Sequence, residues 1–195
     1  MKQSYETIRT ESSARLVEKK SVFIAHSFIV SSESQAIAHI TEIKKKFHDA
    51  THNVYAYYIE GENSQAQQKF SDAGEPSGTA GLPVLEVLRK SHLENVLIIV
   101  TRYFGGTQLG APGLVRAYGK VASMCIAASE IITKDICTLV EVEIPYSQLE
   151  KIQKFASEHK LEISQSTFGE KVALALLVPN SQLENWELFI QNSLR

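Results

Sequence analysis

The chain has 195 residues, of which 44% are hydrophobic and 22% charged, as is typical of a globular protein with one large core or two small ones. A net charge of −2 excludes a strongly basic nucleic-acid-binding protein. No apolar run approaches the roughly 20 residues that span a bilayer, and the first residues have no apolar core of a signal peptide. We therefore expect a cytoplasmic protein that does not contact membranes. Cys125 and Cys137 have apolar neighbours, so we expect both to be buried, reduced thiols rather than zinc ligands.

The first third of the chain alternates between strand and helix patterns. Residues 22–24 and 28–30 are β-rich runs, and residues 33–50 carry apolar side chains at helical spacing after a run of capping serines. Residues 52–61 alternate as a strand, and the polar residues 62–68 are typical of a loop.

The middle of the chain contains most of the glycines. Thr79 is predicted to cap a helix that has Pro83 in its first turn, because proline is tolerated only there. A strand over residues 95–104 has five consecutive apolar residues, which predicts a central strand covered on both faces. A second glycine loop then leads to Pro112 and a long apolar helix that continues to residue 132.

After Lys134 the pattern changes, and we place a domain boundary there, giving domains of residues 1–134 and 135–195. The second domain is predicted to run strand, helix, strand, strand, helix, with a hairpin around Gly169 and Glu170. This order is a ferredoxin-like βαββα(β) unit whose final strand is missing. The fold class is therefore α+β.

The first glycine loop, SDAGEPSGTAGLP, holds several candidate binding residues: Asp72, Glu75, Ser77, Gly78 and Thr79. It has neither the lysine of a phosphate-binding P-loop nor the spacing of a dinucleotide fingerprint. Both glycine loops nevertheless lead into a helix N-terminus, where free N–H groups favour an anion. The alternatives are that the loops are only capped, tightly packed turns, and that the two acids are a turn cap and a solvated charge rather than a carboxylate pair.

The second candidate stretch is TRYFGG, which supplies Arg102, Tyr103, Phe104, Gly105 and Gly106, with Arg116 in the following helix. An arginine beside aromatic rings can pair with a phosphate and stack a base. The alternative is that the rings belong to the core and that Arg102 pairs with Asp72 or Glu75. Lys44, Lys45 and Lys46 form a secondary basic patch, which the helix dipole also explains. His48 and His52 have the i,i+4 spacing of some zinc ligands, but the helix is expected to end near Asp49 and only Asp72 is a candidate third ligand, so no metal or other cofactor is predicted.

Three stretches together, DATHNVYAYYI, DAGEPSGTAGLPVL and NVLIIVTRYFGGTQLGAPGLVRAYGKVA, resemble the YigZ/IMPACT family over residues 15–125. The resemblance implies a bacterial-type, two-domain member without the RWD domain of its eukaryotic relatives. It implies an N-terminal domain with the ribosomal-protein-S5 domain-2-like fold and a ferredoxin-like C-terminal domain, similar to domains IV and V of elongation factor G. Ala73 stands where the family commonly has an acid, which weakens a catalytic interpretation of the acids beside it.

We therefore expect a non-catalytic protein that associates with RNA or the ribosome and acts in translation or its regulation. This expectation rests on fold analogy and on the Arg102 region. One alternative is a hydrolase acting on a phosphate-containing or peptide substrate in the glycine-loop cleft, although no catalytic residue is identified. The other is a protein-interaction module, since a missing final strand leaves a sheet edge open to a partner chain or to self-association.

Overall fold

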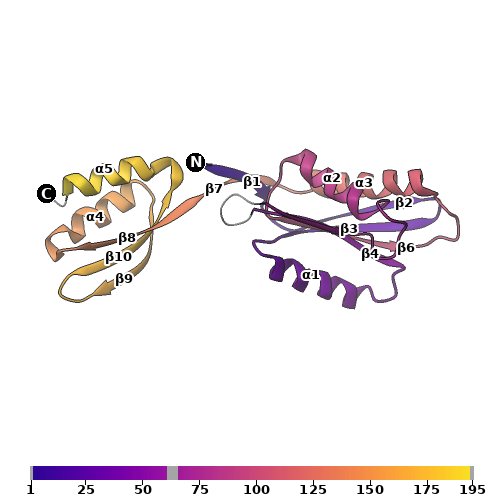
Figure 1. The fold of residues 1–195 in the computed structure, drawn as a ribbon, viewed down its shortest axis with the longest axis horizontal. Helices are drawn as coiled ribbons and strands as arrows, with labels where there is room; N and C mark the ends of the chain where they lie inside the picture. The colour runs from indigo at the N-terminus through magenta and orange to yellow at the C-terminus, as the bar shows by residue number, and fades with distance from the viewer. Residues whose placement is uncertain (1, 61–65, 194–195) are drawn as a thin grey trace. The chain divides into compact units, whose positions relative to one another are not determined.

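The computed structural model describes residues 2–60 and 66–193, which divide into two compact units (Figure 1). The N-terminal unit consists of residues 6–133, and the C-terminal unit of residues 2–5 together with 134–193. Both units contain helices and strands, as the sequence predicts. Within the described residues, no helix is long and apolar enough to cross a membrane.

The N-terminal unit is built on a five-stranded sheet in which every neighbouring pair is antiparallel. Its strands, in spatial order, are β2 (Ser12–Glu18), β3 (Ser21–Ile29), β6 (Val96–Tyr103), β4 (His52–Ile59) and β5 (Gln67–Ser71). The two β-rich runs predicted at 22–24 and 28–30 are parts of the single strand β3. Residues 67 and 68, predicted as loop, begin β5, whereas positions 62–65 of that loop lie outside the described residues.

Strand β6 is the centre of the sheet and is covered on both faces, as predicted. Val96, Ile98 and Val100 point into the core beneath α2 (Gly81–Ser91) and α3 (Ala111–Ala127). Leu97 and Ile99 point into a second cluster beneath α1 (Glu33–Lys46). Figure 1 shows α2 and α3 on one face of the sheet and α1 on the other. The alternation of side chains along a strand explains how one apolar run serves two cores.

The predicted helices are confirmed, with changes at their ends. Ser32 caps α1 by accepting the Gln35 N–H, and Pro83 lies in the first turn of α2. Helix α3 ends at Ala127 rather than at residue 132, because Ile131 already begins a strand. That strand, β7 (Ile131–Asp135), pairs with β1 (Ser4–Ile8) in a separate two-stranded sheet.

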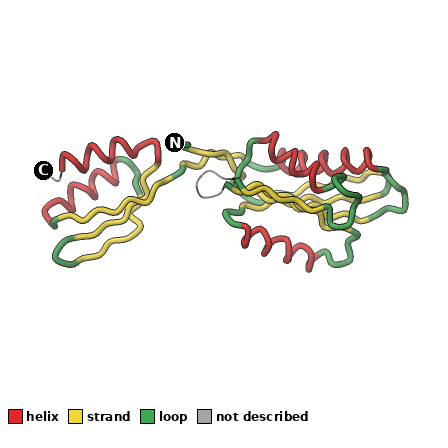
Figure 2. The backbone as a smooth tube through the Cα atoms, in the orientation of Figure 1, coloured by secondary structure: helices red, strands yellow, loops and turns green. Residues whose placement is uncertain are grey.

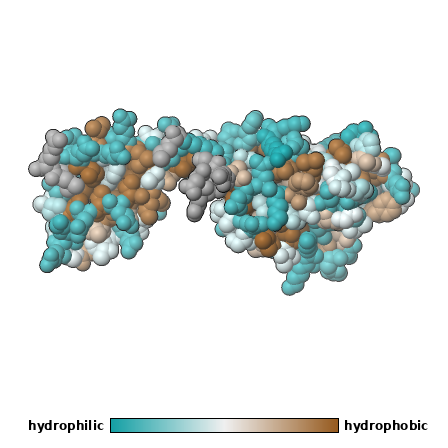
Figure 3. Space-filling model, viewed as in Figure 1, coloured by the Kyte–Doolittle hydropathy of each residue, from teal (hydrophilic) through white to brown (hydrophobic). Residues whose placement is uncertain are grey.

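The C-terminal unit has the predicted element order: β8 (Cys137–Ile144), α4 (Tyr146–Glu158), β9 (Glu162–Phe168), β10 (Val172–Pro179) and α5 (Leu183–Ser193). Its strands form an antiparallel sheet in the order β8-β10-β9, and Figure 2 shows both helices over one face of it. Figure 3 shows hydrophobic side chains on the visible face of this unit, and its core is formed by buried side chains from the helices and strands. Among the described residues, no strand covers the outer edge of β8.

The prediction for the cysteines is half right. Cys125 is buried in α3, but Cys137 is exposed, because it begins β8 at the edge of its sheet. Burial raises the pKa of the Cys125 thiol, which keeps it protonated and chemically quiet.

Candidate functional site

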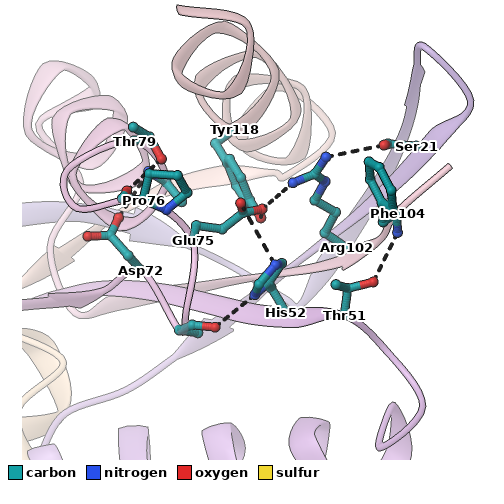
Figure 4. A network of polar contacts seen from close by, with 12 residues as sticks. Ser21, Thr51, His52, Asp72, Glu75, Pro76, Thr79, Arg102, Phe104 and Tyr118 are labelled. Atoms are coloured by element: carbon teal, nitrogen blue, oxygen red, sulfur yellow. Dashed lines mark hydrogen bonds and ion pairs between the residues drawn. The ribbon is translucent and has the colours of Figure 1, made fainter. Parts of the chain in front are cut away.

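The first glycine loop folds around Asp72. Its carboxylate accepts the N–H groups of Gly78 (2.8 Å), Ala80 (3.0 Å) and Gly81 (2.8 Å), and so it satisfies the N-terminus of α2 (Figure 4). The prediction that Thr79 caps this helix is wrong: its hydroxyl donates to the carbonyl of Pro76 instead. A carboxylate carries a full charge and accepts several N–H groups at once, so it outcompetes a nearby hydroxyl. These N–H groups are therefore already occupied and are not free for an external anion.

Glu75 lies at the centre of a buried polar network (Figure 4). Its Oε1 atom accepts from Arg102 Nη1 at 2.6 Å and from the Tyr118 hydroxyl at 2.7 Å. His52 Nε2 lies 3.8 Å from the other carboxylate oxygen. His52 Nδ1 is 2.9 Å from the Ala73 carbonyl, so this nitrogen carries the proton that is donated. Burial, followed by the bond to Glu75, raises the pKa of Tyr118 far above its usual range, so this hydroxyl acts as a donor.

Arg102 belongs to this network rather than to the surface. Its side chain is 6% exposed, and its guanidinium lies over the rings of Phe23 (5.3 Å) and Phe104 (5.6 Å). The sequence left open whether Arg102 binds a phosphate or pairs with Asp72 or Glu75, and the structure shows the ion pair with Glu75. The Arg102 Nη2 atom donates to the Ser21 hydroxyl at 3.3 Å, whereas Nε is buried and has no partner among the described residues.

The second glycine loop packs against a turn formed by two lysines, Lys19 and Lys20. The Gly105 N–H donates to the Ser21 hydroxyl at 3.2 Å, and a Cβ at Gly105 would lie 2.0 Å from the carbonyl carbon of Lys20. Only glycine fits this close approach. Lys19 and Lys20 form the tip of the β2–β3 hairpin with φ angles of 45° and 67°. Such turns prefer Asn-Gly, and a lysine in this conformation costs about 1 kcal/mol. Strain of this kind is concentrated at functional sites.

Next to this turn lies a groove of about 200 Å³ between the hairpin and α3, here called the basic groove. Its charged lining residues are Glu18, Lys19, Arg116 and Lys120, and Lys20 follows directly in the chain. All four cations are exposed, and none has an ion pair within the described parts of the chain. Of these cations only Arg116 was among the candidate residues predicted from the sequence; Lys19, Lys20 and Lys120 were not. Lys19 and Lys20 could not be recognised locally, because the strand that precedes them, β2, was not predicted.

A second hollow, here called the cleft, has a volume of about 420 Å³. Its polar wall includes Thr51, His52, Glu75 and Arg102, and its apolar wall includes Phe104, which is 47% exposed. The first residues of α3 and the loop before them complete it: Gln108, Leu109, Gly110, Ala111 and Leu114. The structure thus brings Glu75, Arg102 and Phe104, from the two candidate stretches, to one cleft.

Other candidate residues lie elsewhere. Ser77 and Gly106 are exposed loop residues that line neither hollow. The Tyr103 hydroxyl donates to Asp49 at 2.8 Å, a bond that raises the pKa of Tyr103. Residues 44–46 are exposed in the last turn of α1, on the opposite face of the sheet from α3.

Helix α1 ends before His48, so His48 and His52 share no helix face. Within the described residues, no cluster of three metal-ligating side chains occurs.

The fold and the site define a class: a two-unit protein of mixed helices and antiparallel sheets, with a basic groove beside a buried ion-pair network. A family model described as "Impact N-terminal domain" matches residues 19–126, and one described as "Domain of unknown function (DUF1949)" matches residues 142–195. IMPACT family member YvyE of Bacillus subtilis is 40% identical over 182 residues, covering 93% of this chain and 83% of that protein. The chain belongs to the IMPACT family and has the two-domain bacterial form, which confirms the resemblance found in the sequence.

Two further relatives show how far the similarity extends. IMPACT family member YigZ of Escherichia coli is 30% identical, covering 85% of this chain and 81% of that protein. The protein IMPACT of Homo sapiens is 34% identical over 98 residues, only 49% of this chain and 30% of that protein. A solved structure described as "Crystal structure of an hypothetical protein" has a TM-score of 0.77 at 26% identity, covering 98% of this chain and 93% of that one.

Proposed function

We propose that this chain is a non-catalytic protein that associates with RNA or the ribosome and acts in translation or its regulation. The observation that carries the proposal is the basic groove, with Lys19, Lys20, Arg116 and Lys120 exposed and without ion pairs in the described structure. Unpaired cations along a groove attract the phosphates of a nucleic acid and release its counterions. The strained hairpin tip supports the same conclusion, because the fold tolerates two unfavourable lysines there.

Fold analogy gives further support. The strand order β8-β10-β9, with its crossover helix α4, suits a ferredoxin-like unit whose fourth strand would pair with β8. We propose this fold for the C-terminal unit and the ribosomal-protein-S5 domain-2-like fold for the N-terminal unit. Both folds occur in a factor that acts on the ribosome, which is an associational argument. A role on the ribosome would also place the protein in the cytoplasm.

The geometry favours binding over hydrolysis in the cleft. Oε1 of Glu75 already accepts from both Arg102 Nη1 and the Tyr118 hydroxyl, and the carboxylate is buried. A general acid or base needs a free path to its substrate. Turnover of phosphate esters or peptides by the pure protein would overturn the non-catalytic part of the proposal.

Co-sedimentation with ribosomes at two salt concentrations tests the proposal. The triple variant Lys19→Gln, Arg116→Gln, Lys120→Gln should bind more weakly, and the slope of log affinity against log salt should fall by about one for each lost phosphate contact. The matched control is the triple variant Lys44→Gln, Lys45→Gln, Lys46→Gln, which removes the same charge from the opposite face. Equal weakening in both variants, or none in the first, would contradict the role of the basic groove.

A further inference from the structure

The cleft and the basic groove adjoin each other. Leu109 lines both of them, and the first turns of α3 separate them, with Gly110 and Leu114 on the cleft side and Gly113 and Arg116 on the groove side. A chain lying in the groove would therefore pass the opening of the cleft. Both hollows lie within the N-terminal unit.

The N-terminus of α3 is open, unlike that of α2. Its N-cap residue, Gly110, has φ 73° and provides no side-chain cap. Pro112 has no N–H group, and Leu114 already bonds to the Gly110 carbonyl at 3.0 Å. The N–H groups of Ala111 and Gly113 have no acceptor within the helix, as for any first turn. Such N–H groups, together with the helix dipole, favour an anion at the edge of the cleft.

A second and independent feature lies in the cleft wall. The Arg102 side chain is 6% exposed, yet its Nε donor has no partner among the residues described. A buried donor without an acceptor is rare in native proteins, and because the Nε atom is sealed from solvent, the side chain would have to shift for an acceptor on a ligand to reach it. Phe104 lies against the same guanidinium and is 47% exposed, so it offers a flat apolar face to the cleft. Its N–H donates to the Thr51 hydroxyl at 3.0 Å, which fixes its backbone.

We propose that the cleft takes one nucleotide of a single-stranded RNA, with the base against Phe104 and its phosphate at the N-terminus of α3. The flanking backbone continues into the basic groove, so the inference rests on the proposed function. A volume of about 420 Å³ lies within the range of small-ligand sites. The strand must be single, because a base inside a duplex is stacked and cannot enter a side pocket.

The test is fluorescence anisotropy of the full chain with a labelled single-stranded oligonucleotide, the same oligonucleotide with abasic sites, and a duplex. Phe104→Ala should weaken binding of the single strand roughly five- to hundredfold, the range for loss of one base–aromatic stack. Phe104→Tyr, which keeps the ring face, should bind like the wild type. Because Phe104 contacts no phosphate in this proposal, the salt dependence should stay unchanged in Phe104→Ala.

The abasic strand and the duplex make the test specific to a base. Phe104→Ala should bind either of them as the wild type does. If Phe104→Ala binds the single strand normally, or weakens binding to all three probes equally, the nucleotide site is refuted. The proposed function survives that result if the groove variant still loses ribosome binding. If Phe104→Ala still binds the single strand normally and the groove variant still binds ribosomes, both the nucleotide site and the proposed function are refuted. Circular dichroism of each variant excludes unfolding as the cause of any loss of binding.

Discussion

The Glu75–Arg102 ion pair gives the sharpest prediction about stability. Both side chains are nearly fully buried, at 4% and 6% exposure, and they meet at 2.6 Å. Glu75→Gln leaves the Arg102 charge buried without a counter-charge, and Arg102→Met leaves Glu75 in the same situation. Removing one partner of a buried pair costs about 3–5 kcal/mol. The double variant leaves neither charge, so its loss should fall below the sum of the single losses by about 2–3 kcal/mol.

Urea denaturation of the full chain measures these losses. Far-UV circular dichroism reports on both units, whereas Trp186 is the only tryptophan and lies in the C-terminal unit. Its fluorescence therefore serves as an internal control, and hydrogen exchange of the β6 amides reports on the unit that contains the pair. Additive losses, or single losses below about 1 kcal/mol, would show that the pair does not act as a buried unit.

Three further predictions concern the same unit. Asp72→Ala should lower the free energy of unfolding by about 1–2 kcal/mol, measured by urea denaturation, because α2 loses its cap; no loss would contradict that role. Gly105→Ala should lower the melting temperature because of the contact at 2.0 Å, whereas Gly119→Ala, in open space within α3, should raise stability by about 1 kcal/mol. Burial, and then Lys46, lowers the pKa of His26, so the unfolded chain binds this proton more readily and stability should decrease as the pH falls below about 6.5. His26→Leu should reduce that pH dependence in thermal melts, and an unchanged slope would assign it to other groups.

Periodicity predicted most of the regular elements. The apolar run of β6 and the position of Pro83 are local signals, and the structure agrees with both. The short strands β1, β2, β5 and β7 were missed, because each has exposed or polar positions and gains its stability from a neighbouring strand. A strand that is stabilised mainly by its partner has only a weak strand pattern in its own sequence.

The site was predicted in part, and the errors are tertiary. Thr79 was the predicted cap of α2 because a cap is normally adjacent to its helix, whereas Asp72 contacts the N-terminus of that helix only because the loop folds back. Whether Arg102 faces solvent or Glu75 depends on how β6 packs beneath α3. No pattern of neighbouring residues in the sequence gives that packing. The basic groove was missed for the same reason: Lys19 and Arg116 are far apart in the chain and meet only when the hairpin packs on α3.

The buried network also bears on the surface that we propose to bind RNA. Glu75 holds Arg102, and Arg102 Nη2 and the Gly105 N–H both donate to the Ser21 hydroxyl. Ser21 directly follows Lys20, so these bonds fix the end of the strained lysine turn. Loosening the ion pair would let the turn relax toward ordinary φ angles and move the lysines without removing a charge. Glu75→Gln should therefore weaken RNA binding while the charge of the groove, and with it most of the salt dependence, is retained. Measured with the abasic strand, which places no base in the cleft, that outcome would separate positioning of the lysine turn from an effect of Glu75 on the cleft wall.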